Sequence, residues 1–329
     1  MKNKNIGCWL LLAGSSSVCA MQPLDDQSLA AAMQPLDDQS LAAATGQNGL
    51  TLGIQADQVK FNQVALIDTN GIASTSYNSK AGLVIAGNST NPVPGIEFIK
   101  AAVSTNPSFN IAIDTDAGGG NPFLNLAVTM GSDVNGIRLL PFSVYLAPSA
   151  SLSSPSDYAL TSYAPKSIFS SGTTVNTGVK ELIRSTGNLD INFVQTNKPR
   201  LNIQLGHAAQ SVMVKFGGAI QSICSAASGC PITLVSDSTG ATFGFKFAGT
   251  NASTGFVLDG FYAGVDPTGL TIGNIGVSSK FDASLNNVTL GNLGTQSTTT
   301  FNNLPNGSMG SFGVTGASVT DFKMKVSGF

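Results

Sequence analysis

The chain contains few residues that suit catalysis, because its 329 residues include a single histidine, His207. A nucleophilic triad needs a histidine base that an acid orients toward a nucleophile. No Gly-x-Ser-x-Gly, Walker or His-Glu-x-x-His motif occurs in the sequence. We interpret His207 as a structural residue at a strand end and expect a protein that is not an enzyme; a secreted hydrolase is the alternative.

Two aspartates, Asp114 and Asp116, have the alternate spacing of calcium ligands and precede the glycines at 118–120. Alternating oxygen ligands followed by glycine suit a hard cation. The stretch lacks a third carboxylate at the right place and a closing glutamate. Asp and Gly are ordinary turn residues. We therefore predict a turn between strands and no cofactor, and we keep Asp114 and Asp116 as weak candidate metal ligands.

Residues 1–20 have the pattern of a secretory signal peptide, with Lys2 and Lys4 before a short apolar stretch and small residues leading to Ala20. The apolar stretch is too short to span a bilayer. A lipoprotein signal is the alternative because Cys19 lies near its end, but the preceding residues do not match the usual lipidation pattern. We predict a cleaved signal peptide and an exported chain.

Two cysteines beyond residue 20, Cys224 and Cys230, enclose five small residues. Cysteines this close together in an exported chain favour a disulfide that closes a short loop. A zinc site would need more ligands than two thiolates. We predict a Cys224–Cys230 disulfide.

The composition is weakly charged: 10% of residues are charged, 42% are hydrophobic, and the formal net charge is -2. Intrinsic disorder requires low hydrophobicity with high net charge, so this composition excludes it. The chain also lacks the basic runs that form an electrostatic footprint for nucleic acid. We expect a folded chain that does not bind nucleic acid.

From Leu50 the hydrophobic pattern has a period of two, since Leu50, Leu52 and Ile54 alternate with Thr51 and Gly53. Such alternation, bounded by turn residues, predicts strands. It recurs along most of the chain, while amphipathic helical patterns are scarce. We predict an all-β fold, sandwich or jelly-roll-like, in one or two β domains, with a β-solenoid as the alternative.

The predicted organisation follows from repeats and composition. Residues 21–32 recur unchanged at 33–44, which is typical of a tolerant segment, and we treat 21–48 as a duplicated N-terminal segment. Residues 147–166 are rich in serine and proline and predict a linker or long loop. This loop separates a β domain or first half at 49–146 from a second one at 167–329.

The C-terminal stretch also alternates, with Phe322, Met324 and Val326 separated by Lys323 and Lys325. A terminal strand at a sheet edge can pair with another chain by strand addition. The stretch resembles the terminal strand of chaperone-usher pilins, with a glycine thirteen residues before the end at Gly316. Where those pilins have a penultimate aromatic residue, this chain has Gly328 and ends on Phe329.

A second resemblance concerns the N-terminal region. The segment MQPLDDQSLAAATGQ at 33–47, directly before an alternating strand, resembles Fil-type pilus-system proteins secreted by Gram-negative bacteria. The resemblance extends through about Gly71. It implies a fimbrial protein that passes through the periplasm to the cell surface or fimbrium and acts in cell adhesion and biofilm formation.

The expected function is therefore a structural subunit of a pilus or fimbria-like fibre that assembles by β-strand exchange. Its implied partners are copies of itself, with a periplasmic chaperone and an outer-membrane usher. A tip adhesin or carbohydrate-binding module is the alternative. The expected assembly strands are carried by Leu50, Leu52, Ile54, Phe322, Met324 and Val326.

Overall fold

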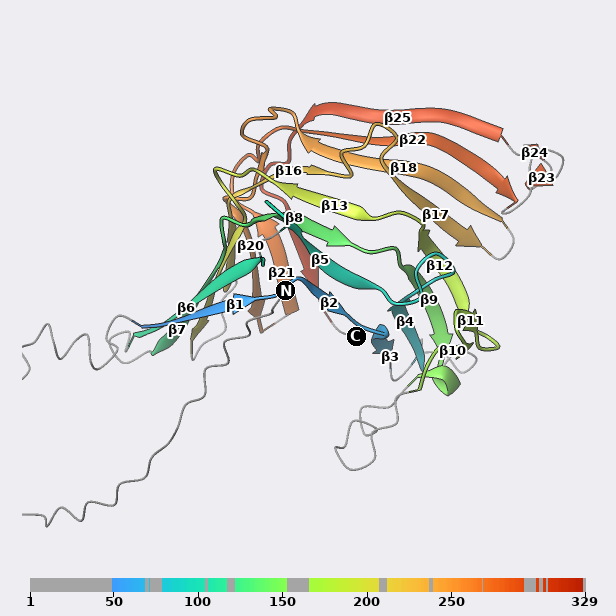
Figure 1. Ribbon diagram of the computed structural model, residues 1–329, viewed down its shortest axis with the longest axis horizontal. Helices are drawn as coiled ribbons and strands as arrows, with labels where there is room; N and C mark the ends of the chain where they lie inside the picture. Colours follow the sequence, from blue (N-terminus) through green and yellow to red (C-terminus); the bar gives the residue numbers. More distant parts are fainter. Residues whose placement is uncertain are drawn as a thin grey trace, which may run out of the picture. The chain divides into compact units, whose positions relative to one another are not determined.

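The computed structural model describes residues 49–68, 71, 79–103, 106–116, 122–152, 166–206, 212–236, 239–267, 269–292, 300–301, 304–305 and 307–327. The chain divides into two units, Met1–Asn48 and Gly49–Phe329, and the described residues all belong to the second. They form β-strands joined by turns and one short 3-10 turn at Ser149–Ser151, with no α-helix among them (Figure 1). The all-β prediction is confirmed.

Sheet A has eight strands, each antiparallel to its neighbours. Adjacent strands in the sheet are often distant in sequence, so most of its pairings are not simple hairpins. In spatial order the strands are β1 (Leu50–Gln55), β6 (Ser108–Asp116), β7 (Phe123–Met130), β14 (Arg200–Gly206), β15 (Val214–Gly217), β20 (Phe261–Asp266), β21 (Gly269–Asn274) and β26 (Lys323–Val326).

Sheet B has fourteen strands and branches at a long central strand, β18 (Thr239–Gly249). One edge of β18 pairs with β22 (Phe281–Asn292), which pairs with the outer strand β25 (Gly307–Ala317). The other edge is shared by two arms, which Figure 1 shows diverging from β18. The first arm is β16 (Ala219–Ile223), β13 (Leu189–Phe193), β8 (Val134–Leu139), β5 (Gly95–Lys100) and β2 (Gln58–Lys60), with β19 (Phe256–Val257) beside β16. The second arm is β17 (Cys230–Ser236), β12 (Lys180–Ser185), β9 (Ser143–Pro148), β4 (Ala81–Ala86) and β3 (Gln63–Asp68).

Two short strand pairs complete the described fold. They are β10 (Phe169–Ser171) with β11 (Thr174–Val175), and β23 (Thr300–Phe301) with β24 (Leu304–Pro305). All strand pairings of the described residues are antiparallel, whereas a β-solenoid stacks its strands in parallel.

The two stretches 49–146 and 167–329 interleave in both sheets. In sheet A, β7 from the first stretch pairs with β14 from the second, and in sheet B, β8 pairs with β13 and β9 with β12. Contacts of this kind make Gly49–Phe329 one compact unit. We therefore describe the two stretches as halves of that unit; residues 153–165 of the predicted linker lie outside the described residues.

A closed hydrophobic core lies against β4 and β9. Its buried members are Val84, Ala86, Tyr145, Ala147, Leu152, Ile168 and Val179. The buried Tyr145 hydroxyl donates a hydrogen bond to the carbonyl oxygen of Gly87 at 2.8 Å. Burial raises the pKa of this hydroxyl, and the nearby Glu181 carboxylate adds to the effect.

Aromatic side chains join the two sheets. Phe98 on β5 and Phe109 on β6 lie edge to face with ring centroids 4.4 Å apart. Phe256 on β19 packs against Phe261 of sheet A at 5.5 Å and against Phe281 of sheet B at 5.6 Å. Such pairs add stability beyond the area they bury. The apolar faces of the two sheets are thus in contact at these clusters.

Candidate assembly edges

The two predicted assembly strands are the outermost strands of sheet A. Among the described residues, β1 pairs only with β6, and β26 pairs only with β21. Every residue of both strands is exposed. The structure therefore does not bring β1 and β26 together; it places them at opposite edges of one sheet.

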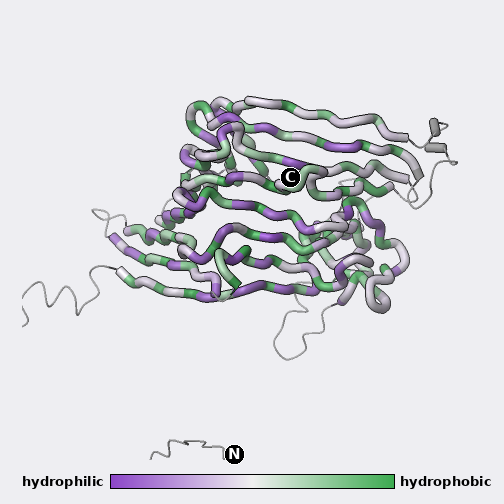
Figure 2. Tube along the Cα trace, turned by 45° about the horizontal axis from the view of Figure 1, so that its top comes forward, coloured by the Kyte–Doolittle hydropathy of each residue, from purple (hydrophilic) through white to green (hydrophobic). Residues whose placement is uncertain are grey.

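A single apolar row connects these two edges. Because side chains alternate between the faces of a strand, residues that are opposite one another across every pairing share one face. The row crosses all eight strands of sheet A and consists of Leu50, Ile113, Leu126, Ile203, Val214, Ala263, Ile272 and Met324. The alternation of hydrophobic and hydrophilic residues along the strands is visible in Figure 2. Sheet A thus has one apolar face that runs from edge to edge.

In β1, the backbone N–H and C=O groups of every second residue point toward the free edge of the sheet. The Ala56 N–H donates to the Pro107 carbonyl at 3.1 Å, which continues the β1–β6 register. In an antiparallel pair, residues that exchange hydrogen bonds alternate with residues that do not. Leu50, Leu52 and Ile54 therefore bond to β6, and the backbone groups of Thr51, Gly53 and Gln55 point away from it.

Backbone groups of β26 alternate in the same way between the β21 side and the free edge. The Asn274 N–H donates to the Phe322 carbonyl at 2.9 Å, in register with the β21–β26 ladder. Met324 and Val326 consequently bond to β21, and the backbone groups of Lys323 point away from it. At both edges the backbone groups of the apolar residues hydrogen-bond to the neighbouring strand of sheet A. The backbone groups of the residues between them point toward the free edge.

Polar contacts fix where β26 begins. The buried Asn274 side chain accepts a hydrogen bond from the Phe322 N–H at 2.9 Å and donates to the Gly276 carbonyl at 2.8 Å. The Asp321 carboxylate accepts from the Gly276 N–H at 2.7 Å. On the polar face, Lys325 Nζ lies 3.5 Å from Asp266 Oδ1. These contacts hold the C-terminal strand in a defined position on β21.

Sheet B has a long edge strand that sequence reasoning did not single out. All but two residues of β25 are exposed, including Phe312 and Val314. The signal was present, since Phe312 and Val314 alternate with Gly313, but the frequent glycines hid the strand.

The Asp282 carboxylate anchors the end of β25 by accepting a hydrogen bond from the Gly316 N–H at 2.7 Å. The Thr250 hydroxyl donates to the same oxygen at 2.7 Å. These hydrogen bonds, that of Thr250 first, lower the pKa of Asp282.

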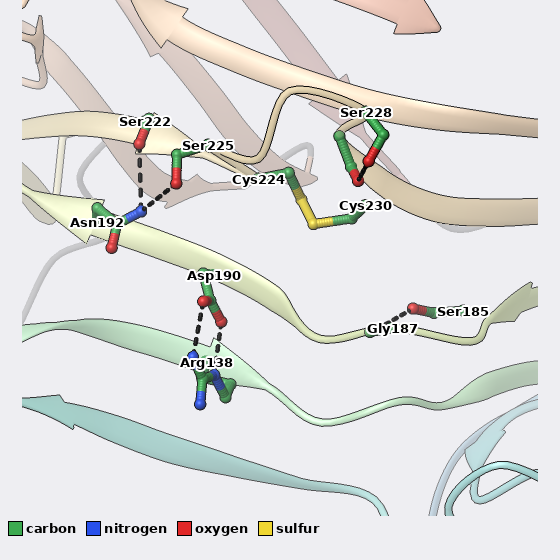
Figure 3. The surroundings of a disulfide bond; sticks show 11 residues. Arg138, Ser185, Gly187, Asp190, Asn192, Ser222, Cys224, Ser225, Ser228 and Cys230 are labelled. Atoms are coloured by element: carbon green, nitrogen blue, oxygen red, sulfur yellow. Dashed lines mark hydrogen bonds and ion pairs between the residues drawn. A yellow bond between two sulfur atoms is a disulfide. The ribbon is translucent and has the colours of Figure 1, made fainter. Parts of the chain in front are cut away.

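The predicted disulfide is confirmed. Cys224 and Cys230 are bonded, with Cα atoms 5.2 Å apart, and they close the turn between β16 and β17 (Figure 3). The Cys224 N–H donates to the Asp190 carbonyl at 2.8 Å. The Asp190 side chain receives two hydrogen bonds from Arg138, at 2.7 and 2.8 Å, which raise the pKa of Arg138. The disulfide is therefore a structural element at the centre of sheet B.

The other candidate residues do not form a site in the part of the chain that the structure describes. Asp114 and Asp116 lie at the end of β6, and Asp114 Oδ1 accepts the Thr115 N–H at 2.9 Å. His207 and the glycines at 118–120 lie outside the described residues. No group of three or more His, Cys, Asp or Glu side chains among the described residues is arranged to hold a metal. The described residues likewise include no helix long and apolar enough to cross a membrane.

Comparison with known proteins adds one match. The model of a family of unknown function, DUF6160, matches residues 1–114, a stretch that includes β1 and most of β6. No curated protein and no solved structure matches the chain.

Proposed function

We propose that this chain is a structural subunit of a surface pilus or fimbria-like fibre that assembles through its β-strands. The supporting observation is that β1 and β26 are the opposite outer strands of one antiparallel sheet. Edge strands present unpaired backbone groups that can pair with another chain. A subunit with one such strand at each edge can bind a neighbour on either side.

The distribution of apolar side chains supports the same proposal. Among the described residues, exposed large hydrophobic side chains outnumber buried hydrophobic ones. Apolar residues scattered singly on a surface are normal, but a contiguous apolar patch marks an interaction site. Here the exposed residues include Leu50, Leu52 and Ile54 at one edge of sheet A and Met324 and Val326 at the other. Assembly would remove these side chains from water.

Export, the signal peptide and the periplasmic route belong to this proposal. A periplasmic chaperone would cover an edge strand before assembly, and an outer-membrane usher would present the subunit to the growing fibre. Since β26 is already paired with β21 in the chain itself, edge-to-edge addition fits the geometry better than exchange of that strand. Strand exchange stays a prediction.

The direct test is negative-stain microscopy with mass spectrometry on material sheared from the cell surface. We expect thin filaments composed mainly of this chain, beginning near Met21. Deleting 318–329, which removes β26, should abolish filaments while leaving export intact. Normal filaments from the truncated chain would contradict assembly through β26, and a chain found only as a soluble monomer would contradict the fibre role. A single copy per filament would indicate the alternative, a tip adhesin.

A further inference from the structure

We infer that copies of this chain join head to tail, with β1 of one copy adding beside β26 of the next, in the register that places Leu52 opposite Met324. The inference rests on the proposed function and specifies its junction. The strand direction, the backbone pattern and the side-chain chemistry of the two edges all fit this junction.

The directions of β1 and β26 allow copies to add side by side in one orientation. Among the described residues, sheet A contains an even number of strands, eight, and each is antiparallel to its neighbours. β1 and β26 therefore run in opposite directions. A second copy placed in the same orientation beside the first brings its β1 antiparallel to β26 and keeps the apolar face on the same side. The sheet can continue from copy to copy without turning a subunit over.

The backbone pattern and the side chains together select the register. Gly53 in β1 and Lys323 in β26 both direct their backbones outward, so they can exchange hydrogen bonds across the junction. Leu52 and Met324 then form a pair that does not exchange hydrogen bonds, in which side chains lie closest. The same register pairs Leu50 with Val326 and Ile54 with Phe322.

Other registers are worse. A slip of one residue would place the apolar side chains of one edge on the polar face of the other. A slip of two would keep the faces but leave an apolar residue without its partner. The polar face also fits, because the neutral Thr51, Gly53 and Gln55 of β1 meet the lysines of β26 without like-charge repulsion.

The junction joins two different surfaces and is therefore heterologous. A heterologous contact makes a ring if its rotation closes and an open filament if it does not. Addition of twisted sheets edge to edge advances each copy along the sheet with a further rotation. If this rotation does not close a ring, the result is an extended filament with an unpaired β1 at one end and an unpaired β26 at the other.

Cysteine cross-linking between copies tests the register. Leu52→Cys and Met324→Cys change side chains that are 40% and 42% exposed, so each variant should fold. The two variants are purified separately, mixed under assembly conditions and oxidised, and covalent dimers are measured on non-reducing gels and by mass spectrometry. The mixture should give a disulfide between residues 52 and 324, and each variant alone should give little.

The matched control replaces Leu52→Cys by Leu50→Cys, which lies on the same face but two residues out of register. Diagonal pairs are too far apart for an unstrained disulfide, so this mixture should give about tenfold less dimer. An equal or larger yield from Leu50→Cys would overturn the register. Filaments that form with neither the 52–324 nor the 50–324 cross-link would overturn the β1–β26 junction while retaining the fibre role. In that case, a disulfide between Val64→Cys and Phe312→Cys chains would assign the junction to β3 and β25 of sheet B. A 52–324 link in a chain that forms no filaments would retain the junction and contradict the fibre role.

Discussion

Leu50 and Met324 lie in the two outermost strands of sheet A, yet they belong to the same cross-strand row. Six apolar residues fill the positions between them, one on each intervening strand. The first and last described strands of the chain are therefore related by the register of an entire sheet. This relationship is the reason that β1 and β26 can be complementary edges of one assembling unit.

The disulfide should stabilise the chain by restricting the unfolded state. Closing a loop of this size contributes about 2 kcal/mol. We expect the double variant Cys224→Ala with Cys230→Ala to lose that amount of unfolding free energy, measured by urea denaturation, and the reduced native chain to match it. Ser225→Ala, an exposed change in the same loop, is the control and should change little. An unchanged midpoint in the double variant would contradict a stabilising role.

The attachment of β25 should depend on pH. The Asp282 pKa is lowered by the Thr250 hydroxyl and the Gly316 N–H, so the folded chain favours the carboxylate. A carboxyl group whose pKa is lowered by folding stabilises the folded chain at pH values above its ordinary pKa of 3.8. That stabilisation is lost as the pH falls through the lowered pKa. Amide exchange at Gly316, corrected for its intrinsic pH dependence, should therefore accelerate only in acid.

Asp282→Asn is the matched variant for that measurement, because it keeps an acceptor oxygen but cannot ionise. It should weaken protection at Gly316 at neutral pH and remove the pH dependence. If the variant and the native chain show the same acid transition, Asp282 is not the group that controls the end of β25.

The closed core against β4 and β9 should be sensitive to cavities. Ile168 is fully buried, and Ile168→Ala should cost about 3 kcal/mol of unfolding free energy. Leu66 on the nearby strand β3 is 76% exposed, so Leu66→Ala should change stability by less than about 0.5 kcal/mol. Denaturant melts of the two variants measure the difference. Equal losses would show that β3 is covered in solution, which would locate an interface there.

Local patterns in the sequence are sufficient to predict these strands and the disulfide. The alternation at Leu50–Ile54 and at Phe322–Val326 predicts strands because side-chain direction depends only on neighbouring residues. The disulfide follows from the short separation of Cys224 and Cys230. The sheet order could not be predicted, because pairings such as β7 with β14 join residues far apart in the chain and depend on the whole fold. That order is what places β1 and β26 at opposite edges.

The edge strand β25 was not predicted from the sequence for a related reason. Its apolar residues Phe312 and Val314 are interrupted by glycines, and glycine is more typical of turns and bulges than of strands. The long strand β22 pairs along most of β25 and holds this glycine-rich stretch extended. Tertiary pairing thus overrides a weak local preference there, and only the structure reveals it.

The central claim, assembly through the free edge of β1, is tested most directly by two substitutions at Gly53. A Cβ at Gly53 would meet only Asn110 Oδ1 at 3.9 Å, so Gly53→Ala should fold and assemble normally. Gly53→Pro should also fold, since the Gly53 N–H does not bond to β6 and proline is tolerated on an edge strand. It removes the outward donor and adds bulk at the junction.

Filament mass per cell is then measured by shearing and electron microscopy, with thermal unfolding of each purified chain as the folding control. We predict that Gly53→Ala retains filaments and that Gly53→Pro reduces them about tenfold or more, as expected from losing at least 1.4 kcal/mol per junction. Normal filaments from a folded Gly53→Pro chain would contradict assembly through β1.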